Sequence, residues 1–186
     1  MRRFLVSLLE VVEVAVVALG AVFLIRTFLV QPFLVSGASM APNFLNGDYL
    51  LVDQLTYYFR EPGRGEVVVF RYPNDKSTYF IKRIIGLPGD RVEIENGKVR
   101  LYDSGHPDGT VLKEVYLPSR SLTATRPGGQ TEFTLEEGEY LVLGDNRSFS
   151  FDSRDWGILP GTDIVGLVRL RLWPLNGFTV FAAPSY

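Results

Sequence analysis

The sequence predicts a mainly β protein, built of bent antiparallel sheets or a partly closed β-barrel and preceded by one N-terminal transmembrane helix. Two observations lead to this prediction. The chain opens with a long apolar segment, and after residue 30 it breaks into short apolar runs separated by Gly, Pro, Asn and Asp. Short runs of this kind are typical of strands. We therefore divide the chain into a cytoplasmic N-terminus with a transmembrane anchor, 1–34, and an extracytoplasmic β-rich domain, 35–186.

The N-terminal segment offers a membrane span of the required length, about 20 residues, from Val11 to Val30. Glu13 and Arg26 lie near the ends of this span, where long charged side chains reach the lipid headgroups. A pair of arginines precedes the segment, and the next basic residue after Arg26 is Arg60. The positive-inside rule then predicts a single-pass plasma-membrane protein with its N-terminus in the cytoplasm and its β domain on the outer face.

Two other interpretations of this segment are open. A cleaved secretory signal also has basic residues and a short apolar core, and Ala18-Leu19-Gly20 loosely resembles a cleavage site. The apolar run continues past Gly20, however, which favours a retained anchor. A buried core helix of a soluble domain is less favoured still, because the run has no polar face.

The β domain contains seven runs with the length and polarity of strands: 48–54, 66–72, 78–86, 91–94, 98–102, 139–143 and 164–173. Asn96-Gly97, between two of them, is a strong signal for a two-residue hairpin. Residues 103–133 are polar and show little alternation. We expect them to form a long surface excursion rather than a second domain.

Composition removes several classes of function. The formal charge is −2 and the basic residues are scattered, so no nucleic-acid surface is expected. The chain has no cysteine, which excludes disulfides, thiolate zinc sites and a cysteine nucleophile. Its single histidine, His106, excludes a two-histidine metal site within the chain. We expect neither a metal nor a cofactor.

Ser39 is a candidate nucleophile a few residues beyond the apolar segment, within Ser36-Gly37-Ala38-Ser39-Met40-Ala41-Pro42. A serine nucleophile needs a base that takes its proton. His106 is a base by residue type, but it lies in a stretch rich in Gly, Pro and Asp. We interpret it as an exposed loop histidine.

Lys82 is the remaining candidate base. Strand alternation places Phe80, Lys82 and Ile84 on one face of the run 78–86. Large apolar neighbours remove water from a lysine and so lower its pKa toward neutrality. The pattern alone is equally consistent with an amphipathic lysine whose amine reaches out to solvent.

Three segments, in this order, resemble the signatures of the bacterial type I signal peptidases, the serine–lysine leader peptidase family. The first is Ser39-Met40-x-Pro42 with the run 47–52, and the second is the run 82–90, Lys-Arg-Ile-Ile-Gly-Leu-Pro-Gly-Asp. The third is the run 144–154, Gly-Asp-Asn-Arg-Ser-Phe-Ser-Phe-Asp-Ser-Arg, which Trp156-Gly157 follows. The order, the spacing and the anchor all agree, from about residue 11 to residue 173.

The resemblance implies a membrane-bound serine endopeptidase that cleaves N-terminal signal peptides from secreted preproteins, close to the secretion machinery and the lipid bilayer. Ser39 would attack the scissile carbonyl and Lys82 would act as general base. Ser150 matches the position whose hydroxyl orients the lysine. Three charged residues match those that hold the geometry of the site: Asp145, Asp152 and Arg154.

The oxyanion hole is the point at which the chain departs from some of these relatives. The backbone N–H of Ser39 would be one donor. Gly37 occupies the position where those relatives have a serine whose hydroxyl is the second donor, and Ser36 is one residue further away. The second donor therefore stays open. Phe149 and Phe151 interleave with the third signature. An apolar surface near the membrane and packing as core aromatics are both open for them, and core packing is slightly favoured.

Two rival functions are less favoured. Self-cleaving repressors of the DNA-damage response also resemble these peptidases in their serine–lysine pair, but they carry a DNA-binding domain where this chain has an apolar segment. A catalytically silent, membrane-tethered β module that binds a partner would be expected to have lost Ser39 or Lys82, and both are present.

Overall fold

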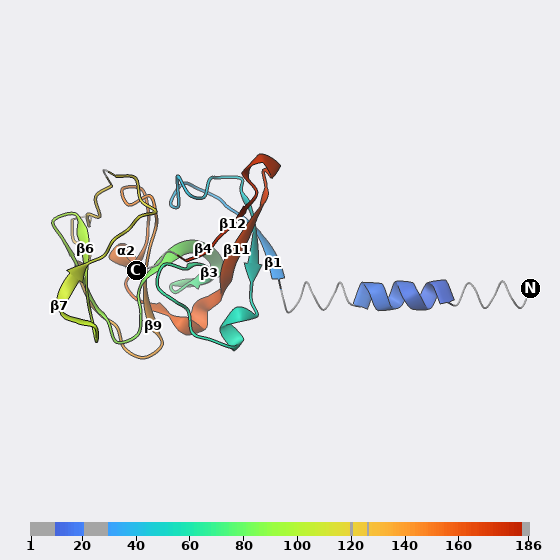
Figure 1. Ribbon diagram of the computed structural model, residues 1–186, viewed down its shortest axis with the longest axis horizontal. Helices are drawn as coiled ribbons and strands as arrows, with labels where there is room; N and C mark the ends of the chain where they lie inside the picture. The colour runs from blue at the N-terminus through green and yellow to red at the C-terminus, as the bar shows by residue number, and fades with distance from the viewer. Residues whose placement is uncertain (1–9, 21–29, 120, 126, 184–186) are drawn as a thin grey trace, which may run out of the picture.

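The structure is a computed structural model that describes residues 10–20, 30–119, 121–125 and 127–183 (Figure 1). Residues 10–20 are helical. Among the described residues, no helix combines the length and the apolar character needed to cross a bilayer. The predicted span from Val11 to Val30 includes residues 21–29, which lie outside the described part of the chain.

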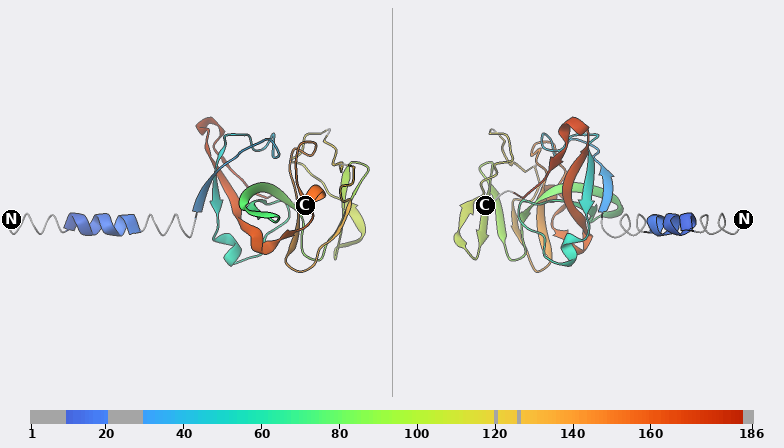
Figure 2. Two further views of the ribbon diagram at one scale, coloured as in Figure 1. Left: turned by 180° about the vertical axis from the view of Figure 1, so that it is seen from behind. Right: turned by 45° about the vertical axis from the view of Figure 1, so that its right-hand side comes forward.

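The rest of the described chain is mainly β, as predicted, and forms two antiparallel sheets that lie side by side (Figures 1 and 2). The larger sheet has the order β1-β2-β11-β3-β4-β9-β10, and β12 also pairs with β11. Its strands are β1 (Val30–Leu34), β2 (Tyr49–Asp53), β3 (Val67–Tyr72), β4 (Asp75–Gly86), β9 (Glu139–Leu143), β10 (Leu159–Pro160), β11 (Ile164–Trp173) and β12 (Thr179–Val180).

The smaller sheet has the order β7-β6-β5-β8. Its strands are β5 (Arg91–Glu95), β6 (Lys98–Asp103), β7 (His106–Val111) and β8 (Glu132–Thr134). β1 lies at one end of the body and β7 at the other (Figure 1). The outermost strands of each sheet do not pair with each other in the described chain, so the sheets stay open instead of closing into a barrel. The short helices are η2 (Thr56–Tyr58), α2 (Ser153–Trp156), η3 (Gly161–Asp163) and η4 (Leu175–Gly177).

Each of the seven predicted strands is present, as β2, β3, β4, β5, β6, β9 and β11. β1 lies inside the range assigned to the anchor, yet it is an edge strand whose five residues all pair with β2. Pattern could not separate it from the apolar segment, because apolar residues resume at Phe33 and Leu34 after only Gln31 and Pro32.

Residues 103–133 are more ordered than the surface excursion we expected. They contain β7, which pairs with β6, and most of β8, which pairs with β5. Leu112 and Thr123 are buried, and their backbone N–H groups donate to Val99 O and Gly97 O at 2.9 and 2.8 Å. The segment therefore covers the β5–β6 hairpin, because its few apolar side chains pack on the core of the smaller sheet.

Two loops meet beside β4. Ser39 lies in the loop between β1 and β2, which Met40 and Phe44 anchor in the core. The third signature follows β9, which pairs with the second half of β4. Lys82 to Gly86 are all buried, because β4 lies between β3 and β9 and is covered on both faces.

Candidate active site

Ser39 and Lys82 are in direct contact. Lys82 projects from β4, and its Nζ is 2.8 Å from Ser39 Oγ in the β1–β2 loop. The same amine donates to the carbonyl of Ile81 at 2.9 Å. The loop is held in a turn by Met40, whose carbonyl accepts the N–H of Phe44 at 2.9 Å. The structure thus brings together the two residues that the sequence singled out as nucleophile and base.

Burial lowers the pKa of Lys82 from 10.5 to about 8, although the negative charges of Asp152 and Asp145 act in the opposite direction. The lysine is buried, and the ring of Phe80 lies 5.2 Å from its Nζ. Desolvation disfavours the charged form of an amine. A fraction of Lys82 is therefore neutral, and able to accept a proton, near neutral pH.

The third signature is tied through Asn146 to the loop between β1 and β2 that carries Ser39, which we call the nucleophile loop. The backbone N–H of Asn146 donates to the carbonyl of Ser39 at 3.0 Å, and its side-chain amide donates to the carbonyl of Ala38 at 3.0 Å. Gly144 packs so closely that a Cβ there would lie 2.4 Å from Ser39 O and 2.1 Å from Ser150 Oγ. The site needs a glycine at this position because two chain segments converge on it.

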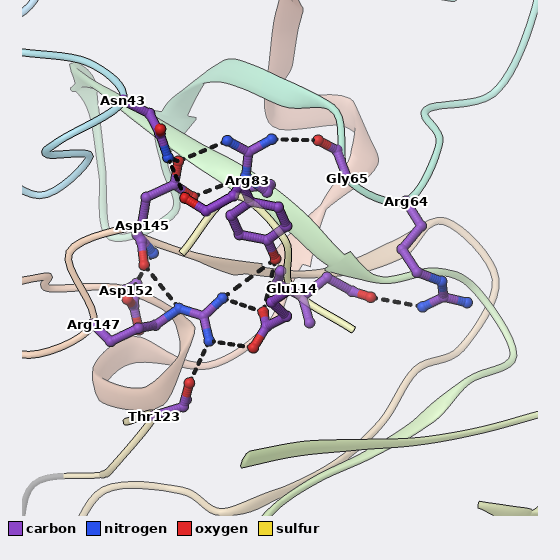
Figure 3. A network of polar contacts seen from close by, with 12 residues as sticks. Asn43, Arg64, Gly65, Arg83, Glu114, Thr123, Asp145, Arg147 and Asp152 are labelled. Atoms are coloured by element: carbon purple, nitrogen blue, oxygen red, sulfur yellow. Dashed lines mark hydrogen bonds and ion pairs between the residues drawn. The ribbon is translucent and has the colours of Figure 1, made fainter. Parts of the chain in front are cut away.

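Asp145 and Arg83 form a buried ion pair (Figure 3), and Arg83 directly follows Lys82 in β4. Arg83 Nε and Nη2 lie 2.8 and 2.6 Å from the two carboxylate oxygens, and Arg83 Nη1 donates to Gly65 O at 2.8 Å. Asn43 Nδ2 donates to Asp145 Oδ2 at 2.8 Å. Two parallel charge-assisted bonds fix orientation as well as distance. Asp145 therefore joins β4, the nucleophile loop and the third signature.

Asp152 organises the other end of the third signature. It caps α2 by accepting the N–H of Arg154, and it also accepts the N–H of Gly144 at 2.9 Å. Burial raises the pKa of Asp152, but hydrogen bonds from Arg154, Gly144 and Ser150 and the charge of Arg154 outweigh burial and hold the pKa below 3.8. The hydroxyl of Ser150 is buried, and a Cβ at Gly144 would lie 2.1 Å from its Oγ. Its expected role in orienting Lys82 stays a prediction.

A cavity of about 340 Å³ opens beside Ser39 and Lys82. Its walls are mostly apolar and come from β1, the residue after it, β2, β3 and β4: Phe33, Val35, Leu50, Val69, Phe80 and Ile81. Phe149 and Phe151 also line it, and they are 77% and 46% exposed. The expectation that these two are core aromatics is wrong, because the loop after β9 turns their side chains toward the cavity and solvent.

Gly37 adopts a φ of +97°, a conformation that L side chains rarely adopt. Its N–H donates to Asn46 Oδ1 at 2.9 Å. Gly37 therefore shapes the loop that precedes Ser39, and Ser36 lies beside it on the cavity wall. The second oxyanion donor stays open.

His106 lies in the smaller sheet, at the start of β7, and its exposed ring has Nδ1 3.0 Å from Asp103 Oδ1. It is a strand residue and not the loop residue we expected. No group of three or more His, Asp or Glu side chains that could hold a metal ion occurs in the described parts of the chain.

Sequence reasoning missed several residues that build the site. Asn43 and Asn146 lie in or beside the quoted signatures, so their amides were visible but had no assigned partner. Glu114 and Tyr116 lie in the segment taken for a surface excursion, and no sequence signal marks them. Arg147 belongs to the third signature and is buried, whereas charged residues of a solvated turn would be exposed.

Comparison with known proteins identifies the family. The family model described as signal peptidase, peptidase S26, matches residues 8–173. "Probable signal peptidase I-1" of Synechocystis sp. is 35% identical over 177 residues, which cover 90% of this chain and 83% of that protein. "Signal peptidase I P" of Bacillus subtilis subsp. natto is 34% identical over 176 residues, which cover 91% of each chain. A solved signal peptidase I from Enterococcus faecalis matches with a TM-score of 0.46 and 30% identity, over 58% of this chain and 97% of that one. The resemblance seen in the sequence is confirmed, and the chain belongs to the signal peptidase family, peptidase S26.

Proposed function

We propose that this protein is a membrane-bound endopeptidase that cleaves signal peptides from secreted preproteins, with Ser39 as nucleophile and Lys82 as general base. The observation that carries the proposal is the 2.8 Å contact between Ser39 Oγ and Lys82 Nζ. A base within hydrogen-bond reach of a serine hydroxyl, with a pKa near the working pH, is what serine activation requires. Lys82 meets both conditions, because burial brings its pKa to about 8.

In the first half of the reaction, the neutral amine of Lys82 takes the hydroxyl proton as Ser39 Oγ attacks the scissile carbonyl carbon. The backbone N–H of Ser39 stabilises the oxyanion that forms. The tetrahedral intermediate then collapses, and the ammonium of Lys82 gives its proton to the leaving amine. The products of this half are an acyl-Ser39 ester and the new N-terminus of the released chain.

In the second half, Lys82 is neutral again and takes a proton from water. The water oxygen attacks the ester carbonyl, and the intermediate expels Ser39 Oγ, which recovers the proton from Lys82. Asp145, Asp152 and Arg154 hold the surrounding loop, and Ser150 helps to orient the lysine from beside Gly144. No metal or cofactor takes part in this scheme.

The cavity suits the substrate expected of this family. Its apolar walls and its volume of about 340 Å³ accept small apolar side chains next to the reacting serine. Small residues at the first and third positions before the cut would fit there. Phe149 extends the apolar surface at the cavity mouth, where it can contact the more hydrophobic part of a signal peptide.

The membrane location rests on the N-terminal segment that precedes β1, which would be the cytoplasmic end and anchor, with β1 and the rest of the chain as the outer, catalytic domain. In the described helical part, 10–20, six apolar side chains are 50–70% exposed: Val11, Val12, Val14, Val16, Val17 and Leu19. Apolar side chains exposed along a helix are stable in lipid and unfavourable in water. We expect carbonate extraction to leave the full-length protein in the membrane fraction, and release into the supernatant would favour a cleaved signal or a soluble core helix.

The decisive experiment replaces each member of the pair in the full-length protein, in detergent, with a preprotein as substrate. Ser39→Ala and Lys82→Met should each abolish cleavage while circular dichroism shows an intact fold. The double variant should be no worse than either single variant, because the two residues act as a unit. His106→Ala is the matched control and should cleave normally. Substantial cleavage by Lys82→Met would contradict the assignment of the base.

A further inference from the structure

A second buried ion pair joins Arg147 of the third signature to Glu114 (Figure 3). Arg147 Nη1 lies 2.9 Å from Glu114 Oε2, and Nη2 contacts Oε1. The two side chains are only 1% and 9% exposed. Arg147 Nη1 also donates to Thr123 Oγ1. Because Glu114 and Thr123 lie between β7 and β8, this pair connects that segment to the loop that follows β9.

The remaining donor of the guanidinium points to the candidate active site. Arg147 Nε donates to the carbonyl of Gly144 at 3.0 Å, and the backbone N–H of Arg147 donates to Asp145 O at 3.1 Å. Gly144 lies against the carbonyl of Ser39, and Asn146 holds that same carbonyl. The orientation of Arg147 therefore fixes the turn that touches the nucleophile loop.

Tyr116, two residues after Glu114, contacts two residues beside the Ser39–Lys82 pair. Its ring lies 3.9 Å from the guanidinium carbon of Arg83, the neighbour of Lys82. Its carbonyl accepts the side-chain amide of Asn43 at 2.9 Å, and its hydroxyl donates to Glu114 Oε1 at 2.7 Å. Segment 114–116 thus contacts both arginines that support the Ser39–Lys82 pair.

We propose that Glu114 is a positioning residue for peptide-bond cleavage, which holds Arg147 and, through it, the turn of Gly144 and Asn146 against Ser39. This inference rests on the proposed function of Ser39 and Lys82. Glu114 is not among the residues that line the cavity, so it acts through Arg147 and does not touch substrate. Without the carboxylate, the buried guanidinium loses its paired charge and reorients toward other acceptors. The carbonyl of Gly144 then loses the hydrogen bond that Arg147 Nε donates to it.

The test is Glu114→Gln, which keeps the size of the side chain and removes its charge. Cleavage of a short peptide by the full-length protein in detergent should show kcat lowered by about 10–100-fold, because small misplacement of reacting groups has effects of that size. KM should change by less than about threefold, since the cavity is untouched. The assay is run at a temperature where circular dichroism shows the variant fully folded, so a merely structural role would leave kcat unchanged.

The pH profile gives a second readout. Asp152 and Asp145 are the charges that act on the pKa of Lys82, and Glu114 is not among them. The plateau of activity should therefore fall in Glu114→Gln while the midpoint of the acid limb stays in place. A midpoint that moves with no fall in the plateau would overturn the positioning role.

Milder variants keep the test decisive if Glu114→Gln folds poorly. Glu114→Asp retains the charge and should recover part of kcat. Tyr116→Phe keeps the ring over Arg83, loses only the hydroxyl, and should lower kcat by a few-fold. Arg147→Lys should resemble Glu114→Gln, because an ammonium cannot hold the carboxylate in two places and donate to Gly144 as well.

The matched control is Glu132→Gln, which removes a carboxylate paired with Arg91 at 3.0 Å on the surface of the smaller sheet, where Glu132 is 59% exposed. It should leave kcat and KM unchanged. A kcat within about twofold of the unaltered protein in folded Glu114→Gln, or a loss confined to KM, overturns the inference. If Ser39→Ala abolishes cleavage and Glu114→Gln does not lower kcat, only this inference fails. If Ser39→Ala cleaves, the proposed function fails instead.

Discussion

Arg83, the neighbour of Lys82 in β4, holds both carboxylate oxygens of Asp145, with Nε 2.8 Å from Oδ1 and Nη2 2.6 Å from Oδ2. The side chains are 7% and 0% exposed, so the pair is shielded from water. Asp145 belongs to the third signature and Arg83 to the second. The ion pair therefore sets the distance between the strand that carries Lys82 and the turn that contacts the loop of Ser39.

Asp145→Asn should lower stability and shift the pH profile. Removal of one partner from a buried ion pair costs about 3–5 kcal/mol, because the other charge stays buried without its counterion. The charge of Asp145 raises the pKa of Lys82, so its removal should lower that pKa further and move the acid limb of activity to lower pH. Urea unfolding and a pH–rate profile measure the two effects. The surface variant Glu132→Gln should lose less than about 1 kcal/mol, and an equal loss in both variants would contradict the role of the buried pair.

Lys82 should make both activity and stability depend on pH. Activity on a peptide should rise through a midpoint near 8, the pKa that burial gives this lysine. The limb should be the same in His106→Ala. A limb near pH 6.5, the ordinary pKa of histidine, that disappears in that variant would mean that the base is His106.

The stability effect of Lys82 has a definite sign. Its pKa is about 8 in the folded protein and 10.5 as the ordinary value, so between these pH values the unfolded chain binds the proton more tightly. The burial of Lys82 therefore lowers the free energy of unfolding most below pH 8. This penalty falls by about 3 kcal/mol as pH rises to 10.5. Lys82→Met should lack this pH dependence, so the difference in unfolding free energy between the two proteins should change by that amount across the window. Parallel curves for both proteins would contradict burial of the lysine.

Gly144→Ala should reduce activity far more than stability alone explains. A Cβ at this position would lie 2.1 Å from Ser150 Oγ and 2.4 Å from Ser39 O, so the turn and the nucleophile loop must separate. We expect kcat to fall by about 100-fold or more, because the misplaced atom is next to the nucleophile. Gly63→Ala is the matched control, since its nearest neighbour, a side-chain atom of Glu66, would lie at an ordinary 3.6 Å. Similar kcat values for the two variants would show that the close approach at Gly144 is dispensable.

Much of this fold could be predicted from sequence, because period-two alternation and turn residues mark a strand locally. β4 illustrates both the success and its limit. Alternation correctly placed the apolar ring of Phe80 beside Lys82, but it could not show that Arg83, on the opposite face, is buried as well. That burial depends on Asp145, which is 62 residues away in the chain. Pattern within one strand carries no information about such a partner.

The residues that contact the two buried arginines could not be predicted from sequence for the same reason. Glu114 and Tyr116 lie in a stretch with little alternation, and only the folded chain brings them to Arg147 and Arg83. Similarly, the apolar character of Phe33 is equally suited to a membrane segment and to an edge strand. Its pairing with Leu50 in β2 decides between the two.

β1 leads to the last prediction, which concerns where the chain can be shortened. A chain that begins at residue 30 keeps β1, whereas a chain that begins at residue 35 loses all five of its pairs with β2. It also loses Phe33, which lines the cavity and whose ring lies 5.5 Å from that of Tyr79. The shorter chain would expose the edge of β2 and open one wall of the cavity beside Ser39. We expect the chain from residue 30 to retain kcat/KM on a soluble peptide.

We expect the chain from residue 35 to lose at least about tenfold in kcat/KM, mainly through KM, since the wall contacts substrate and the Ser39–Lys82 pair is retained. A full-length Phe33→Ala variant separates the two causes, because it keeps β1 and removes only the wall. It should show the same rise in KM with a smaller loss of stability in urea. Equal kcat/KM for the two shortened chains would mean that β1 takes no part in binding the substrate.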